Sequence, residues 1–229
     1  FLEGLREETQ KAGTLLIFDE VVTGFRVAPG GAQAHSGVTP DLATFAKILA
    51  GGLPGGAVAG REDVMRHLET KATPEETHRT KIPHHGTFNA NPLSAAAGCA
   101  MLESIADGEA IRAANKSAAA LRRGMNEILA GEKISWKVYG DHSDWKIFYD
   151  AGTPPVDGED QSVRGVPWKR LNARHPEKSR ALRQAVILHG IDFNGDRALV
   201  STAHTPDIIE ETLAGFASAV RMLKKEGVA

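Results

Sequence analysis

Residues 41–56, DLATFAKILAGGLPGG, place one lysine inside an apolar run and follow it with a glycine-rich turn. Lysine is among the residues that are least often buried without a partner. One interpretation of Lys47 is structural, with the aliphatic stem packed and the ammonium in water. The other is functional, with the amine at the end of a strand. Taken alone, the stretch favours the structural interpretation, and the surrounding sequence decides between the two.

A second apolar run, TLLIFDE (14–20), ends in two acids and is typical of a strand buried on both faces of a parallel sheet. Segments 38–47 and 55–60 predict two further strands. Ligands of open α/β sheets bind at the carboxyl ends of the strands, so we expect Asp19 and Lys47 to face one crevice. They form either a simple ion pair or the carboxylate and amine that pyridoxal phosphate chemistry requires. Spacing alone does not choose between these two.

The rest of the chain predicts helices, loops and a second group of strands. Helices are expected over 1–13, 61–69, 91–107, 109–131, 179–190 and 205–225, strands over 133–140 and 144–150, and short strands near 191–194 and 198–204. Residues 70–86 and 151–167 are expected to be loops because they are rich in residues such as Pro, Thr, Gly and Asp. A break at Asp107-Gly108 divides the sequence into a βα-rich part, 1–107, and an α+β part, 108–229.

Composition excludes several classes of function. The 229 residues carry a formal net charge of −2, and this balance does not indicate binding to nucleic acid or to an anionic membrane. No apolar run is long enough to cross a bilayer. Cys99 is the only cysteine, so no internal disulfide forms, which suits a reducing cytoplasm. Its surroundings, SAAAGCAML, predict a small buried apolar residue in a helix.

Three blocks carry a resemblance to a known family. They are LLIFDEVVTGFR (15–26), GVTPDLATFAKILAGGLPGGAVAG (37–60) and HGTFNANPLSAAAG (85–98). In order and spacing they resemble the signature blocks of the class III, fold type I pyridoxal-phosphate aminotransferases. The segment STAHTPDIIEETLAGFASAV (201–220) is similar to the branch of the family that contains glutamate-1-semialdehyde aminomutase. The resemblance covers essentially the whole first half of the chain.

The resemblance implies a fold and a set of residue roles. The fold would be α/β, with 1–107 the carboxyl-side part of the large cofactor-binding domain and 108–229 a small α+β domain. Lys47 would form the Schiff base with pyridoxal 5′-phosphate, and Asp19 would hold the pyridine nitrogen. Val21 would pack on the ring, and Thr87 would hold the cofactor phosphate of the neighbouring subunit. A cytoplasmic homodimer with shared active sites follows.

The chain also departs from the family pattern. It begins at Phe1 and resembles only the carboxyl-terminal half of such an enzyme, without the phosphate cup and the stacking aromatic ring. The late arginine that grips a substrate carboxylate has no clear counterpart, and Arg197 is expected to be a surface residue. We therefore expect a transaminase for small-molecule amino donors and keto acceptors, inactive as this chain alone. The alternatives are an intramolecular aminomutase and a non-catalytic half-enzyme.

In addition, Glu20 and Arg26 are expected to hold the shape of the turn after the first strand.

Overall fold

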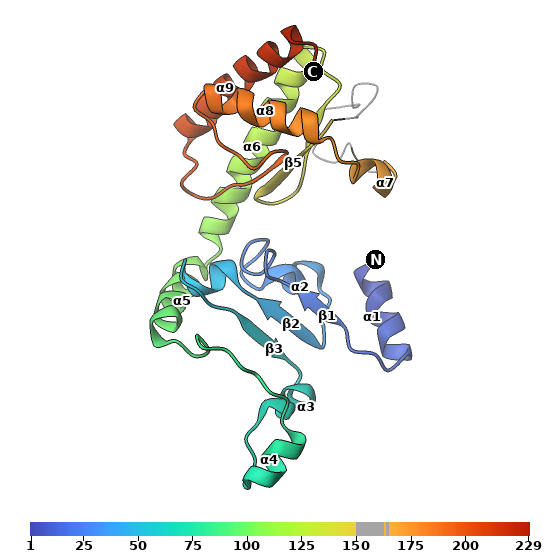
Figure 1. Cartoon of the computed structure of the whole chain (residues 1–229), viewed down its shortest axis with the longest axis vertical. Coiled ribbons are helices and arrows are strands. Elements are labelled where there is room, and N and C mark those ends of the chain that lie inside the picture. Colours follow the sequence, from blue (N-terminus) through green and yellow to red (C-terminus); the bar gives the residue numbers. More distant parts are fainter. Residues whose placement is uncertain (150–162, 164) are drawn as a thin grey trace. The chain divides into compact units, whose positions relative to one another are not determined.

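The computed structural model describes residues 1–149, 163 and 165–229, and these form two compact units, Phe1–Glu109 and Ala110–Ala229 (Figure 1). The predicted loop over 151–167 lies mostly outside the described residues, as does the last residue of the strand predicted over 144–150.

The first unit is built on a three-stranded sheet in the order β1-β2-β3 (Figure 1). Strand β1 (Ile17–Asp19) runs parallel to β2 (Leu42–Phe45), and β3 (Ala57–Gly60) is antiparallel to β2. All three predicted strands are therefore present. The prediction that the first is buried on both faces is wrong for the described residues. Its side chains alternate between core and solvent, and Ile17 is 56% exposed because no described element covers that face.

Helices precede, separate and follow these strands along the chain. They are α1 (Leu2–Lys11), α2 (Gly31–Ser36), the 3₁₀ helices η1 (Lys47–Ala50) and η2 (Arg66–Leu68), α3 (Glu62–Met65), α4 (Pro74–Thr80) and α5 (Pro92–Ile105). Helix α4 corrects the prediction of a loop over 70–86. The side chain of Thr73 accepts a hydrogen bond from Glu76 N, and Pro74 occupies the first turn, so the segment carries a helix start signal.

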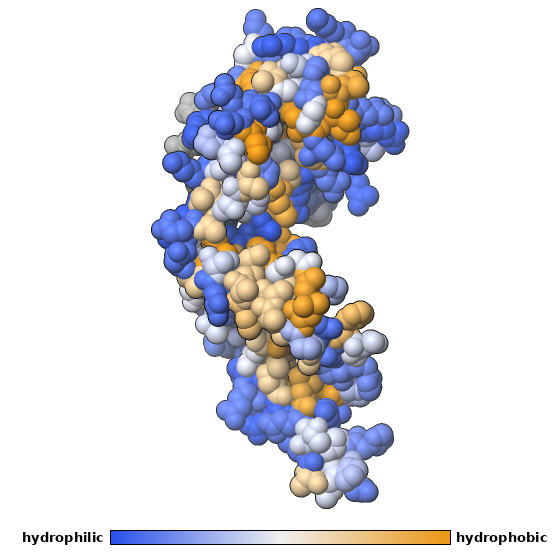
Figure 2. Space-filling view, turned by 90° about the vertical axis from the view of Figure 1, so that its left-hand side faces the viewer, coloured by the Kyte–Doolittle hydropathy of each residue, from blue (hydrophilic) through white to orange (hydrophobic). Residues whose placement is uncertain are grey.

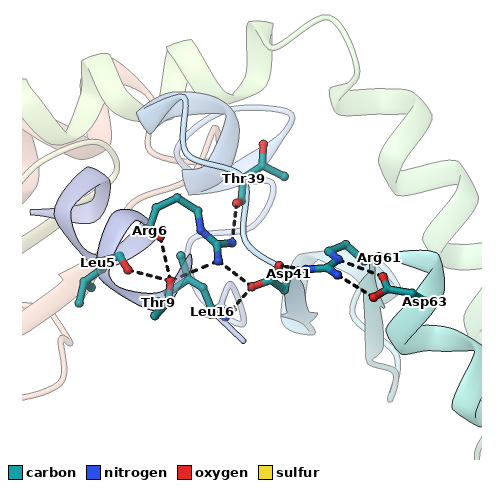
Figure 3. Close-up of polar contacts among 8 residues, drawn as sticks. All are labelled: Leu5, Arg6, Thr9, Leu16, Thr39, Asp41, Arg61 and Asp63. Carbon is teal, nitrogen blue, oxygen red and sulfur yellow. Dashed lines mark hydrogen bonds and ion pairs between the residues drawn. The ribbon is translucent and has the colours of Figure 1, made fainter. Parts of the chain in front are cut away.

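Asp41 links helix α1 to the residue before β1 and the residue after β3 (Figure 3). Its buried carboxylate accepts a hydrogen bond from Leu16 N at 2.7 Å and pairs with Arg6 at 2.9 Å and Arg61 at 2.7 Å. Arg61 also forks onto Asp63. The backbone hydrogen bond from Leu16 and those from the two guanidiniums hold the pKa of Asp41 well below its usual range. This network lies before β2, at the opposite end of the strand from Lys47.

The second unit packs helices on an antiparallel sheet in the order β4-β5-β6. Its elements are α6 (Glu109–Gly131), β4 (Lys137–Tyr139), β5 (Asp144–Phe148), α7 (Trp168–Leu171), α8 (Pro176–Leu188), β6 (Arg197–Leu199) and α9 (Pro206–Lys225). Side chains of α6, α8 and α9 form one core with Trp145 and Ile147 of β5. Within the described part of the chain, no helix is long and apolar enough to cross a membrane.

Candidate functional site

The two parallel strands bring Asp19 and Lys47 to the same edge of the first sheet. Asp19 is the last residue of β1 and stands opposite Thr44 of β2. Lys47 begins η1, two residues after β2 ends at Phe45. Both residues are exposed, and among the described residues no ion pair joins them. The structure thus places the two residues at one edge of the sheet, as expected, without a direct contact between them among the described residues.

Neighbouring groups orient the carboxylate of Asp19. Its Oδ1 atom accepts a hydrogen bond from Val21 N at 3.0 Å and a longer one from Thr44 Oγ1 at 3.4 Å. Its Oδ2 atom has no hydrogen-bond partner within the described chain. One oxygen thus fixes the direction of the side chain, while the other remains available to a donor that arrives from outside.

Lys47 occupies an unusual backbone conformation. After an extended Ala46, its φ angle is +53°, in the left-handed region that side chains other than glycine rarely adopt. Such strain persists only where the surrounding structure fixes it, and it is common at functional sites. Here the surroundings are α5. A Cβ on Gly98 would lie 2.6 Å from Leu49 O, and one on Gly51 would lie 2.6 Å from Ala97 O. Close backbone contact therefore holds the turn that Lys47 begins.

Thr87 lies apart from these residues, in the turn that leads into α5. It is exposed, and among the described residues no hydrogen bond or ion pair links it to Asp19 or Lys47. The turn borders an open groove of about 660 Å³ between the η1–β3 segment and the start of α5, lined in part by Phe88, Asn91 and Cys99. Cys99 is exposed there, which corrects the prediction that it is buried. Its helix is as predicted, but nothing in the described residues covers the outer face of that helix.

Arg197 is engaged in a structural contact in the second unit. Its Nε atom donates to both carboxylate oxygens of Asp144 at 3.0 and 3.1 Å, across the β5–β6 pair. Arg197 is exposed and begins β6, which agrees with the prediction of a surface residue at the start of a strand. The second unit also has a groove of about 620 Å³, lined in part by Trp145 and His204, which contains none of the predicted site residues.

Sequence reasoning missed one contributor to the site, Thr44, and expected a different partner for a second, Glu20. Thr44 contacts Asp19 because the register of β1 and β2 places the two residues opposite each other, and this register cannot be derived from the sequence. Glu20 is fully buried, and its carboxylate accepts hydrogen bonds from the side chain of Thr23 and from the backbone of Ala32 and Gln33. Glu20 was expected to hold the turn through Arg26, whose Nε donates to the backbone oxygen of Val22. The position of Glu20, next to the predicted Asp19, is the one sequence signal for it.

Comparison with known proteins places these features in context. The family model described as Aminotransferase class-III matches residues 1–140. A glutamate-1-semialdehyde 2,1-aminomutase of Pyrobaculum neutrophilum is 38% identical over 232 residues, covering 99% of this chain and 50% of the relative. A second one, from Brevibacillus brevis, is 37% identical and covers 96% and 48%. The chain thus spans about half the length of the curated relatives it matches.

Solved structures agree with this result. An omega-transaminase from Sphaerobacter thermophilus matches with a TM-score of 0.78 and 30% identity, over 96% of this chain and 47% of that one. A glutamate-1-semialdehyde aminomutase from Pseudomonas aeruginosa in complex with PMP matches with a TM-score of 0.79 over 97% and 48% of the two chains. At 22% identity, this second likeness concerns the fold alone.

Proposed function

Because the chain belongs to the class III aminotransferases, with an α/β structure of fold type I, we propose that it is the lysine-bearing part of a pyridoxal-phosphate-dependent enzyme that transfers amino groups. The observation that carries the proposal is the placement of Asp19 and Lys47 at one edge of β1 and β2. In this proposal residues 1–107 are part of the cofactor-binding domain, and 108–229 are the small domain.

The described residues fit this cofactor. Asp19 offers one oriented carboxylate with a free Oδ2 atom, and the exposed Lys47 offers an amine that no described acidic side chain neutralises. When bound, the cofactor supplies an aldehyde that condenses with amines and a pyridine ring that withdraws electrons.

The chain's own residues would do the following work. Asp19 Oδ2 would accept a hydrogen bond from the N–H of the ring nitrogen and keep that nitrogen protonated. Lys47 Nζ would hold the cofactor covalently, and its free amine would hold and move the proton at the substrate carbon. Val21, whose backbone N–H orients Asp19, packs on the face of the ring. The hydroxyl of Thr87 donates to the phosphate.

We assign Thr87 to the active site of a second copy of the chain. Helix α5 is mostly apolar, with Ser94, Glu103 and Ser104 as its polar residues, and it has no distinct polar face, a composition typical of a buried helix. Yet Leu93 is 69% exposed, and Phe88, one residue after Thr87, is 66% exposed. Figure 2 faces the side of the first unit that carries α5 and shows apolar side chains gathered there. A patch of this kind marks an interaction surface, and an identical subunit that covers it would also receive Thr87.

Two reactions would use Asp19, Lys47 and the cofactor in this way, and relatives with each activity are similar to this chain. A transaminase moves the amino group from an amino acid or amino-ketone to an external acceptor in a ping-pong cycle. An aminomutase moves it within one substrate, and the similar curated relatives bear that name. The transaminase is our first proposal because the omega-transaminase structure matches 96% of this chain at 30% identity.

One experiment separates these reactions. The full-length enzyme that contains this chain is supplied with amino donors, with and without an added keto acid. A transaminase turns over only with the acceptor present, whereas an aminomutase forms product from glutamate-1-semialdehyde without one. If neither reaction occurs in an enzyme that has bound pyridoxal phosphate, the proposed function is wrong.

A further inference from the structure

We propose that Glu20 is a positioning residue that holds the turn after β1 and thereby sets the direction of Asp19; this rests on the function proposed above. Glu20 is only 1% exposed, although it carries a carboxylate. An ionised group so deeply buried is costly unless its oxygens are fully hydrogen-bonded. The structure satisfies it with donors drawn from a segment twelve to thirteen residues further along the chain.

Three donors converge on the carboxylate. Its Oε2 atom accepts from Thr23 Oγ1 at 2.6 Å and from Ala32 N at 2.8 Å, and its Oε1 atom accepts from Gln33 N at 2.9 Å. The two backbone donors belong to the first turn of α2, where N–H groups lack partners within the helix. The carboxylate therefore joins the beginning of the β1–α2 loop to its end, at the first turn of α2.

The loop is shaped around this carboxylate. Gly31 has a φ of +71°, and a Cβ there would lie 2.7 Å from each carboxylate oxygen of Glu20. Any other residue would be strained in its backbone and would collide with the carboxylate. The backbone of Glu20 is fixed as well, because its N–H donates to Thr44 O at 2.9 Å and its carbonyl accepts from Gly24 N at 2.9 Å.

The hydrogen bonds that hold Glu20 also fix the orientation of Asp19, because one peptide group connects the two effects. The N–H that orients Asp19 Oδ1 is that of Val21, and it belongs to the peptide joining Glu20 to Val21. When Glu20 is held at its side chain and at both backbone groups, that N–H has one direction, and so has the carboxylate of Asp19. Release of Glu20 would loosen the donor and let Asp19 turn away from a ring nitrogen.

The test is the isosteric variant Glu20→Gln in the full-length enzyme. A glutamine amide matches the shape of the carboxylate, but its NH₂ group must replace one acceptor and face an N–H donor. Glu62→Gln, an exposed acid at the start of α3, is the matched control. Thr23→Val removes only one donor and serves if the glutamine variant fails to fold.

Two readouts are measured. For Glu20→Gln we expect faster amide hydrogen exchange over residues 21–33. We also expect an altered pH midpoint in the absorption spectrum of bound pyridoxal phosphate. The affinity for pyridoxal phosphate should fall at least about tenfold. Thr23→Val changes both in the same direction by less, and Glu62→Gln changes neither.

Different results would contradict this inference and the proposed function. Faster exchange with an unchanged cofactor spectrum and affinity would reduce Glu20 to a purely structural residue and overturn the inference. Unchanged exchange would overturn it too. If the wild-type enzyme does not bind pyridoxal phosphate through Lys47, the proposed function itself fails, whatever the variants do.

Discussion

Two adjacent carboxylates at the end of β1 have opposite environments. Because side chains alternate along a strand, Asp19 faces solvent while Glu20 enters the protein. Asp19 keeps one oxygen free, whereas both oxygens of Glu20 are occupied. The first is suited to meet a ligand and the second to hold a backbone. Identical chemistry thus takes different roles according to burial and hydrogen bonding.

The ionised carboxylate of Asp41 contributes to the stability of the first unit, because its charge is buried and paired. Substitution Asp41→Asn removes the charge that Arg6 and Arg61 share, and it leaves an amide facing two guanidiniums (Figure 3). We expect the free energy of unfolding at pH 7 to fall by about 3 kcal/mol, the typical cost of breaking a buried ion pair. Urea unfolding of the wild type and the variant measures it, with the exposed Asp63→Asn as control.

The same residue predicts a pH dependence. Its folded-state pKa is lowered, so its contribution is complete above the unfolded value of about 3.9 and is lost as the pH falls below that value. The stability gap between the wild type and Asp41→Asn should therefore be constant from pH 7 to 5 and should narrow toward pH 3. A gap that stays constant down to pH 3 would contradict this assignment.

At the scale of elements, the contact of η1 with α5 depends on glycine. Gly98→Ala would place a methyl group 2.6 Å from Leu49 O, so the turn that Lys47 begins must move. We expect a loss of about 1–3 kcal/mol in unfolding free energy, the usual cost of overpacking. The same substitution at Gly4 in α1 meets nothing within 4 Å and should instead stabilise the helix by about 0.5–1 kcal/mol.

Thermal or urea unfolding compares the two variants directly. Opposite signs support close packing at Gly98. Equal stabilisation of both variants would mean that η1 is free to withdraw from α5.

Helices with start signals were the elements that sequence reasoning located best. Asn91 and Thr205 cap α5 and α9 with their side chains as the sequence indicates, and α6 spans the predicted 109–131. Helix α4 was missed because the many Pro, Thr and His residues of its segment outweighed its start signal at Thr73. Chemistry-bearing residues stand out in sequence, but the hydrogen bonds that orient them depend on register and on distant backbone, as with Thr44 and Glu20.

At the scale of the whole molecule, the uncovered face of α5 predicts a dimer. Leu93→Lys would bury a charge in the proposed interface, so the full-length enzyme should shift from dimer to monomer. Leu188→Lys, at the end of α8, where the leucine is 73% exposed, is the control and should leave the dimer intact. Analytical ultracentrifugation measures both. A monomeric wild type, or a Leu93→Lys variant with unchanged dissociation, would contradict the proposed interface.

The central claim is that Lys47 anchors the cofactor, and covalent mapping tests it most directly. The full-length enzyme is incubated with pyridoxal phosphate, reduced with borohydride, digested and analysed by mass spectrometry. We predict a phosphopyridoxyl group on Lys47, and a Lys47→Ala variant that carries no label and loses nearly all turnover. A label on Lys71 or Lys81 instead, together with full activity of Lys47→Ala, would contradict the account.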